Sequence, residues 1–109
     1  MKLPNGERAI VDSAKLREYC LNSQHSRGRH KARVFASVDI LQDDSDFLRE
    51  ALLAAAREAD ARSSGANAYG ERYVVDFEIF RQGRTVNIRS LWIVLTGENL
   101  PRLTTCYVL

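Results

Sequence analysis

The feature of this chain that most constrains its fold is a change of hydrophobic period near residue 65. Before that point apolar residues recur every three to four positions, as on one face of a helix, and after residue 72 they alternate with polar residues, as in a half-buried strand. Residues 63–67 and Gly70 are rich in serine and glycine, which predicts a helix-to-strand connection between the two patterns. Helices followed by strands indicate an α+β fold, with helices packed on one face of an antiparallel sheet of three to four strands.

The length of 109 residues suits one compact core and is too short for two. We therefore predict a single domain over residues 1–109. Its helical half covers about residues 12–62, and its sheet half covers about residues 72–109.

The helical half contains three apolar patterns. The first helix is predicted to begin at Asp12 or Ser13, either of which can cap it, and to end near Asn22. A second pattern runs from Ala32 to Val38 at three-residue spacing, and Asp43 offers a cap for a third, longer helix.

The sheet half begins with a long predicted hairpin. Residues 73–80 and 85–94 alternate apolar and polar side chains on either side of a turn at Gln82-Gly83. Residues 102–109 form a terminal strand, in which alternation places Thr105 and Tyr107 on one face and Thr104 on the other. A strong twist, or a bulge at the paired threonines, would change that assignment.

Several functional classes have no support in the sequence. No apolar run approaches the roughly 20 residues that cross a bilayer, and the first residues lack a secretory signal, so we expect a cytoplasmic protein with no membrane partner. Cys20 and Cys106 are too few for a disulfide framework or a CxxC metal site, and we expect no metal and no cofactor. Neither a P-loop nor a Gly-x-Ser-x-Gly elbow is present.

The positive charge of the chain is concentrated in one place. The formal net charge is only +2, yet the segment from Arg27 to Arg33 carries five cations, His30 included, and no acid. Two histidines and fixed cations at the predicted start of a helix, within His25–Lys31, suit phosphodiester chemistry without a metal. The same polar stretch is also compatible with a solvated connector between two helices.

His25 and His30 are the candidates for proton transfer, because an unperturbed imidazole titrates at about pH 6.5. His30 lies in the predicted first helical turn, where the dipole and neighbouring cations favour its neutral, basic form. His25 lies in the preceding loop, from which it can reach across a cleft. Lys31 would neutralise a nonbridging phosphate oxygen. The further candidates for binding phosphate groups are Arg27, Arg29, Arg33 and Thr104.

Arg89 interrupts an otherwise apolar strand, and two interpretations of it stay open. An arginine in a central strand is usually paired with a carboxylate, here Asp76 or Glu78 of the neighbouring strand. Alternatively, it lies on the open face of the sheet and clamps the phosphate of a transition state. Trp92 is predicted to be a core residue between the sheet and the long helix.

The chain also resembles a family of small bacterial domains of unknown function over nearly its whole length. The matching segments are Leu3-Pro4, Ala9-Ile10-Val11-Asp12, Lys15-Leu16, Tyr19-Cys20-Leu21-Asn22, His25, Gly28-Arg29-His30-Lys31-Ala32-Arg33-Val34-Phe35, Tyr69-Gly70 and Pro101-Arg102-Leu103-Thr104-Thr105-Cys106-Tyr107. The resemblance implies a standalone member of a bacterial gene pair, or the end of a phage-head or polymorphic toxin. In both settings an adjacent gene supplies an antitoxin or immunity protein.

More distantly, the order of helices and strands is similar to the toxin ribonucleases that include barnase, the bacterial EndoU toxins, certain colicins and RelE. That similarity implies RNA cleavage without a metal. In the EndoU-like branch a histidine of the helical half acts with a lysine or second histidine and with a late Thr-x-Tyr, which Thr105-Cys106-Tyr107 matches here. The two separated histidine motifs of EndoU proteins are absent.

These observations predict a toxin-like, metal-independent endoribonuclease whose substrate is RNA, transfer RNA included. Its catalytic candidates are His25, His30, Lys31, Arg89, Thr105 and Tyr107. The alternative is a module without catalysis that uses the same basic patch to bind nucleic acid or a partner protein.

Overall fold

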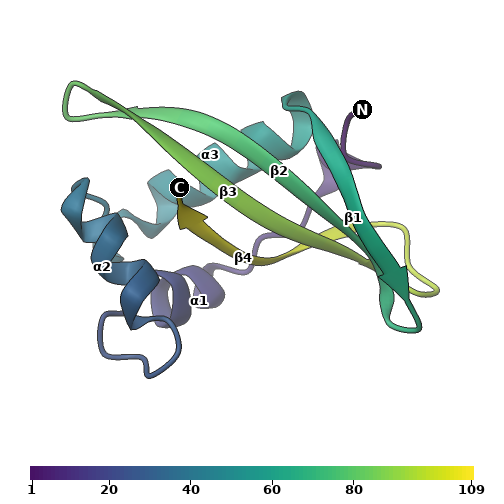
Figure 1. Ribbon diagram of the computed structural model, residues 1–109, viewed down its shortest axis with the longest axis horizontal. Coiled ribbons are helices and arrows are strands. Elements are labelled where there is room, and N and C mark those ends of the chain that lie inside the picture. Colours follow the sequence, from purple (N-terminus) through teal and green to yellow (C-terminus); the bar gives the residue numbers. More distant parts are fainter.

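The computed structural model describes all of residues 1–109 and confirms the α+β class (Figure 1). Its helices are α1 (Ser13–Lys15), α2 (Arg29–Ser37) and α3 (Ser45–Glu58), and its strands are β1 (Ala61–Asn67), β2 (Gly70–Arg81), β3 (Arg84–Leu95) and β4 (Pro101–Val108). The four strands form one antiparallel sheet in the order β1-β2-β3-β4. In Figure 1 α3 lies behind the sheet, while α1 and α2 lie beside the end of β4. None of the helices is long and apolar enough to cross a membrane.

The first helix begins as the sequence predicts. The Asp12 carboxylate accepts a hydrogen bond from the Ala14 backbone N–H at 2.9 Å, which satisfies one of the free donors at the start of α1. After three residues α1 widens into a π-helical turn over Leu16–Cys20, and Leu16 and Cys20 are fully buried. The helical segment therefore ends at Cys20, two residues before the predicted Asn22.

The prediction that Asp43 caps the long helix is wrong by one residue, because Asp44 occupies the cap position. Residues 42–44 form a 3₁₀ turn, and α3 starts at Ser45. The Asp44 carboxylate accepts from the Leu41 N–H at 2.9 Å, so Asp44 closes this turn. At its other end α3 stops at Glu58, short of the predicted limit of residue 62.

Residues 63–67 form an edge strand, where the sequence predicted a connection. β1 pairs with the first half of β2, from Ala61 opposite Val75 to Asn67 opposite Gly70, with an irregularity between Ser63 and Gly65. All of its side chains except that of Ala61 are exposed. An edge strand pairs through its backbone, so this stretch needed no alternation of apolar residues to join the sheet.

The core lies between α3 and the covered face of the sheet. From the sheet it takes Val75, Ile88 and Trp92, and from α3 it takes Leu48 and Leu52, all fully buried. The predicted hairpin is confirmed, since β2 and β3 pair in register over their whole lengths.

A bulge at Thr104 decides which way the end of the chain faces. Leu103 pairs with Trp92 and Thr105 pairs with Leu91, so Thr104 is an extra residue on β4, and its hydroxyl donates to the Leu91 carbonyl at 2.9 Å. Beyond this bulge Cys106 faces the core. The simple alternation, which placed Thr105 on the face of Leu103, is therefore wrong, and the bulge considered above is what the strand forms.

Candidate functional site

The basic loop before α2 is ordered by its own histidine. The Nδ1 atom of His25 accepts hydrogen bonds from the backbone N–H groups of Arg27 and Gly28, at 3.0 and 3.1 Å. A ring nitrogen that accepts two N–H groups carries no proton, so the proton of the neutral ring is on Nε2. In this conformation His25 offers a fixed N–H donor and does not act as a base.

Gly28 lets this loop lie directly against the π-helical turn. A Cβ at that position would lie 2.2 Å from the backbone oxygen of Tyr19. The His25 ring in turn packs edge-on against the Tyr19 ring, with centroids 4.8 Å apart. The glycine within the basic cluster therefore has a packing role.

Lys31, in the first turns of α2, occupies the centre of the site. Its ammonium donates to the Thr105 hydroxyl at 3.4 Å and lies 5.5 Å and 5.7 Å from the ring centroids of Tyr19 and Tyr107. No carboxylate lies within ion-pair distance of it. Two aromatic faces stabilise a cation without neutralising it, so the ammonium keeps a full charge for an incoming anion.

Two shallow depressions border this cluster, one lined by Lys31 itself and the other by Tyr19, which Lys31 contacts. The larger, about 570 Å³, is lined by Asp12, Ala14, Lys15, Glu18, Tyr19, His25 and Thr104. The smaller, about 230 Å³, is lined by His30, Lys31, Val34, Tyr107 and Val108. The larger one carries two carboxylates and the smaller one carries none, so a phosphate is better accommodated in the smaller depression, beside His30.

Two members of this group were not predicted as site residues. Tyr19 has the apolar spacing of a core residue, and nothing in the sequence shows that its ring faces Lys31. Lys15 donates from Nζ to the Thr104 backbone oxygen at 3.3 Å, which links α1 to β4. The position of Lys15, one turn after the predicted helix cap, does not indicate in the sequence that it contacts β4.

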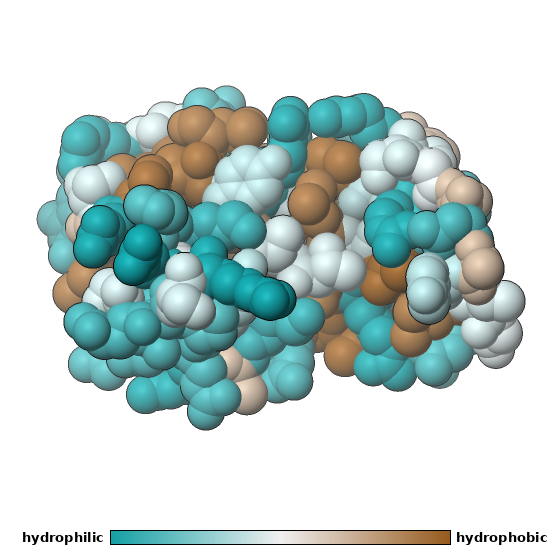
Figure 2. Space-filling view, turned by 60° about the horizontal axis from the view of Figure 1, so that its bottom comes forward, coloured by the Kyte–Doolittle hydropathy of each residue, from teal (hydrophilic) through white to brown (hydrophobic).

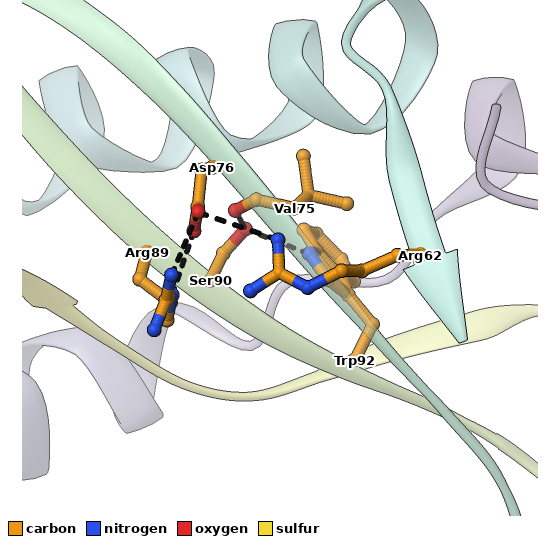
Figure 3. A network of polar contacts seen from close by, with 6 residues as sticks. All are labelled: Arg62, Val75, Asp76, Arg89, Ser90 and Trp92. Carbon is orange, nitrogen blue, oxygen red and sulfur yellow. Dashed lines mark hydrogen bonds and ion pairs between the residues drawn. The ribbon is translucent and has the colours of Figure 1, made fainter. Parts of the chain in front are cut away.

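Arg89 forms an ion pair with Asp76, as the first of its two interpretations predicts. Its Nε and Nη2 atoms donate to the two carboxylate oxygens of Asp76 at 2.8 and 2.9 Å, and Arg62 lies 3.5 Å from the same carboxylate (Figure 3). The hydrogen bonds from Arg89 hold the pKa of Asp76 below its ordinary range. Arg89 also lies opposite Tyr107 in the strand pairing. Its forked face is thus occupied by Asp76.

The remaining basic side chains surround the site without entering it. Arg27, Arg29 and Arg33 are exposed, and no side-chain hydrogen bond or ion pair holds them. Figure 2 shows the helical end of the molecule, on its left, covered largely by hydrophilic side chains. These arginines are placed to attract a polyanion from solvent.

Beneath the site lie the two cysteines, both free and fully buried. The Cys20 sulfur lies 3.9 Å from the Thr105 hydroxyl. A hydrogen bond from the Cys106 thiol lowers the pKa of Cys20, with smaller contributions from Thr105 and Lys31. The same contact, together with burial, raises the pKa of Cys106.

The fold thus brings together the two ends of the predicted site. His25, His30 and Lys31 come from the helical half, and Thr105 and Tyr107 come from the last strand. Thr104 lines the larger depression, although its hydroxyl is held by the Leu91 carbonyl. The structure contains no group of three or more histidine, cysteine, aspartate or glutamate side chains that could hold a metal ion.

Comparison with known proteins identifies the family and little else. No curated protein and no solved structure matches the chain. The predicted membership of a family of unknown function is confirmed, whereas no match bears on a toxin setting or on ribonucleases. One family model matches residues 2–109, nearly the whole chain, and the protein therefore belongs to the family described as Domain of unknown function (DUF6883).

Proposed function

We propose that this protein is a metal-independent endoribonuclease that cleaves RNA by attack of a 2′-hydroxyl oxygen on the adjacent phosphorus. One observation carries the proposal. The unpaired Lys31 ammonium, held by the rings of Tyr19 and Tyr107, lines one depression together with His30, and Tyr19 lines a second one together with His25. A fixed cation next to imidazoles and hydroxyls is what a phosphorane-like transition state requires.

We propose the following roles for the residues of the site. His30 shares the acid-free depression with Lys31 and is the base that takes the 2′-hydroxyl proton. As the 2′-oxygen bonds to phosphorus, the bond to the 5′-oxygen breaks, leaving a 2′,3′-cyclic phosphate. Lys31 stabilises the charge that develops on the nonbridging oxygens. His25, whose Nδ1 is engaged by the loop backbone, donates from Nε2 and orients the phosphate. The 5′-oxygen takes its proton from the Tyr107 hydroxyl or from water.

Incubation of the pure protein with total RNA and transfer RNA in excess EDTA tests this directly. Cleavage with products ending in 2′,3′-cyclic phosphate is expected, and a 2′-deoxy nucleotide at the cleaved position should block it. His30→Ala and Lys31→Ala should each reduce the rate at least about 100-fold. Lys2→Ala is the matched control, because Lys2 lies at the β1 edge of the sheet, hydrogen-bonded to the Glu58 carbonyl.

Intact RNA across all substrates would overturn the proposal, as would undiminished cleavage by a His25→Ala, His30→Ala, Lys31→Ala triple variant. Binding without a product, lost steeply as salt increases, would instead support the alternative of a non-catalytic module.

The toxin setting, with an antitoxin or immunity protein from an adjacent gene, stays a prediction of the resemblance. It is tested by expressing the chain in bacteria alone and with its neighbouring gene. Growth arrest in the first case and rescue in the second is the expected result, and normal growth of cells that accumulate the folded protein would contradict it.

A further inference from the structure

The sheet has one face that no helix covers, and this face continues from the Lys31 site. The covered side packs on α3, whereas the opposite side, nearest the viewer in Figure 1, is open to solvent. We propose that this open face binds single-stranded RNA leading to or from the phosphate beside Lys31. The choice of RNA as ligand rests on the proposed function, while the surface itself is argued from the strand register.

The register assigns side chains to the open face in rows across the sheet. One row runs from Arg72 through Ile93 to Arg102, and the next runs from Val74 through Leu91 to Thr105. The third runs from Asp76 through Arg89 to Tyr107. Apolar side chains therefore form the middle of this face, and arginines lie around them.

The charge of this face favours an anion. Its four arginines, Arg62, Arg72, Arg89 and Arg102, outnumber the three acids beside them, Asp76, Glu78 and Glu98, the last of which pairs with Arg102 at 3.1 Å, so one positive charge is in excess. Asp76 is already engaged by both Arg89 and Arg62 (Figure 3). Arg72 has no acidic partner, and 58% of the Arg62 side chain is exposed. The Arg72 guanidinium is thus free to contact a phosphate, and Arg62, at the exposed side of its ion pair with Asp76, is accessible to a second one.

The shape of the face favours a single strand. The distance across the four strands, from β1 to β4, is three inter-strand spacings, or roughly 14 Å. This width accommodates only a few nucleotides. Leu91 and Ile93, both partly exposed, offer an apolar floor to the faces of unpaired bases, which a duplex keeps stacked inside. Thr105 and Tyr107 belong both to this face and to the Lys31 cluster, so a strand seated on the floor runs directly into the site.

The test uses a fluorescent RNA of about 12 nucleotides with 2′-O-methyl groups, which cannot be cleaved because the attacking hydroxyl is blocked. Binding is followed by anisotropy at several salt concentrations. An Arg62→Gln, Arg72→Gln double variant is expected to bind at least tenfold more weakly, and the slope of log affinity against log salt should decrease by about 0.7 for each lost phosphate contact.

Matched variants make the outcome specific. Arg8→Gln with Arg57→Gln removes the same charge from the 3₁₀ turn at Gly6–Arg8 and from α3, and should leave the salt slope unchanged. Arg62→Lys with Arg72→Lys should retain most of the affinity. Thermal unfolding of each variant shows that it is folded before binding is measured.

Three results would overturn the proposal. The first is an equal loss of RNA affinity in the two glutamine double variants, and the second is a blunt duplex that binds as tightly as the single strand. The third is poly-glutamate that displaces the bound RNA as well as unlabelled RNA does. The last would show a general anion surface suited to an acidic protein. The two proposals also fail separately. If binding depends on the two arginines but ordinary RNA is not cleaved, the proposed RNA-binding surface is supported and the proposed ribonuclease activity is rejected. If RNA is cleaved but binding does not depend on these arginines, the activity is supported and the surface is rejected.

Discussion

A buried hydrogen-bonded pair beneath the site allows a quantitative test of the core. The Ser90 hydroxyl donates to the Val75 carbonyl at 2.7 Å and accepts from the Trp92 indole N–H at 2.9 Å, and both side chains are fully buried (Figure 3). Ser90→Ala removes the acceptor and leaves the indole N–H unpaired where water has no access. An unsatisfied buried donor costs about 1–3 kcal/mol.

We therefore expect Ser90→Ala to lower the free energy of unfolding by about 2 kcal/mol, which corresponds to a decrease in melting temperature of roughly 8 °C. The cause is separated from simple loss of volume by a double-mutant cycle with Trp92→Phe. In the double variant no indole N–H is left unpaired, so the combined loss should fall short of the sum of the single losses by about 1 kcal/mol.

The measurement is urea unfolding followed by far-UV circular dichroism. Fluorescence is unsuitable, since the chain has one tryptophan and the cycle removes it. If Ser90→Ala is as costly in the Trp92→Phe background as in the wild type, the indole bond is not the cause. A loss below about 0.5 kcal/mol in the wild type would refute the reasoning altogether.

Two further predictions concern the loop and the open face. Gly28→Ala should destabilise the fold by about 1–3 kcal/mol, because its Cβ would lie 2.2 Å from the Tyr19 carbonyl oxygen. Ser26→Ala, at an exposed position of the same loop, is the control and should leave the melting temperature unchanged. An unchanged melting temperature for Gly28→Ala would contradict the prediction. Because Arg89 lowers the pKa of Asp76, the carboxylate stabilises the fold above its unfolded-state pKa of about 4, and this contribution disappears as pH decreases through the lowered value. Asp76→Asn should therefore be less stable than the wild type to urea at pH 7, and the difference should shrink as the pH decreases below about 4. A pH-independent difference would exclude the carboxylate as its source.

The elements that the sequence predicts best are those whose period is imposed by one-sided burial. β2, β3 and α3 each bury one face against the same core, so their apolar residues recur at the period of a strand or a helix. Helix ends were less accurate, because Asp43 and Asp44 are both able to cap and only the tertiary structure selects between them.

β1 could not be predicted from periodicity. Its side chains from Arg62 to Asn67 are all exposed, and its place in the sheet depends on backbone hydrogen bonds to β2. Serine and glycine in such a strand look like a loop, and they also suit an edge that must not pair with other chains.

His25, His30 and Lys31 were predicted from their chemistry, and Thr105 and Tyr107 from the resemblance to toxin ribonucleases. That these residues meet depends on contacts that the sequence does not show. Nothing in the pattern around Lys31 indicates that α2 lies against β4, or that Tyr19 contributes a ring to the lysine. The pairing of Arg89 with Asp76 was predictable, because both lie at matching positions of one hairpin.

The bulge at Thr104 connects the fold to the proposed chemistry. In a regular strand Thr105 would share the core face of Leu103, and Tyr107 would follow it there, which would expose Cys106 instead. One extra residue reverses this arrangement: Cys106 fills the core, and Thr105 and Tyr107 emerge beside Lys31 and Arg89. Consecutive threonines suit this position because the first can satisfy the Leu91 carbonyl with its hydroxyl while the second faces the site. Whether the C-terminal residues serve packing or chemistry is thus decided by a single irregularity, which is why the alternation of the last strand was a poor guide to its function.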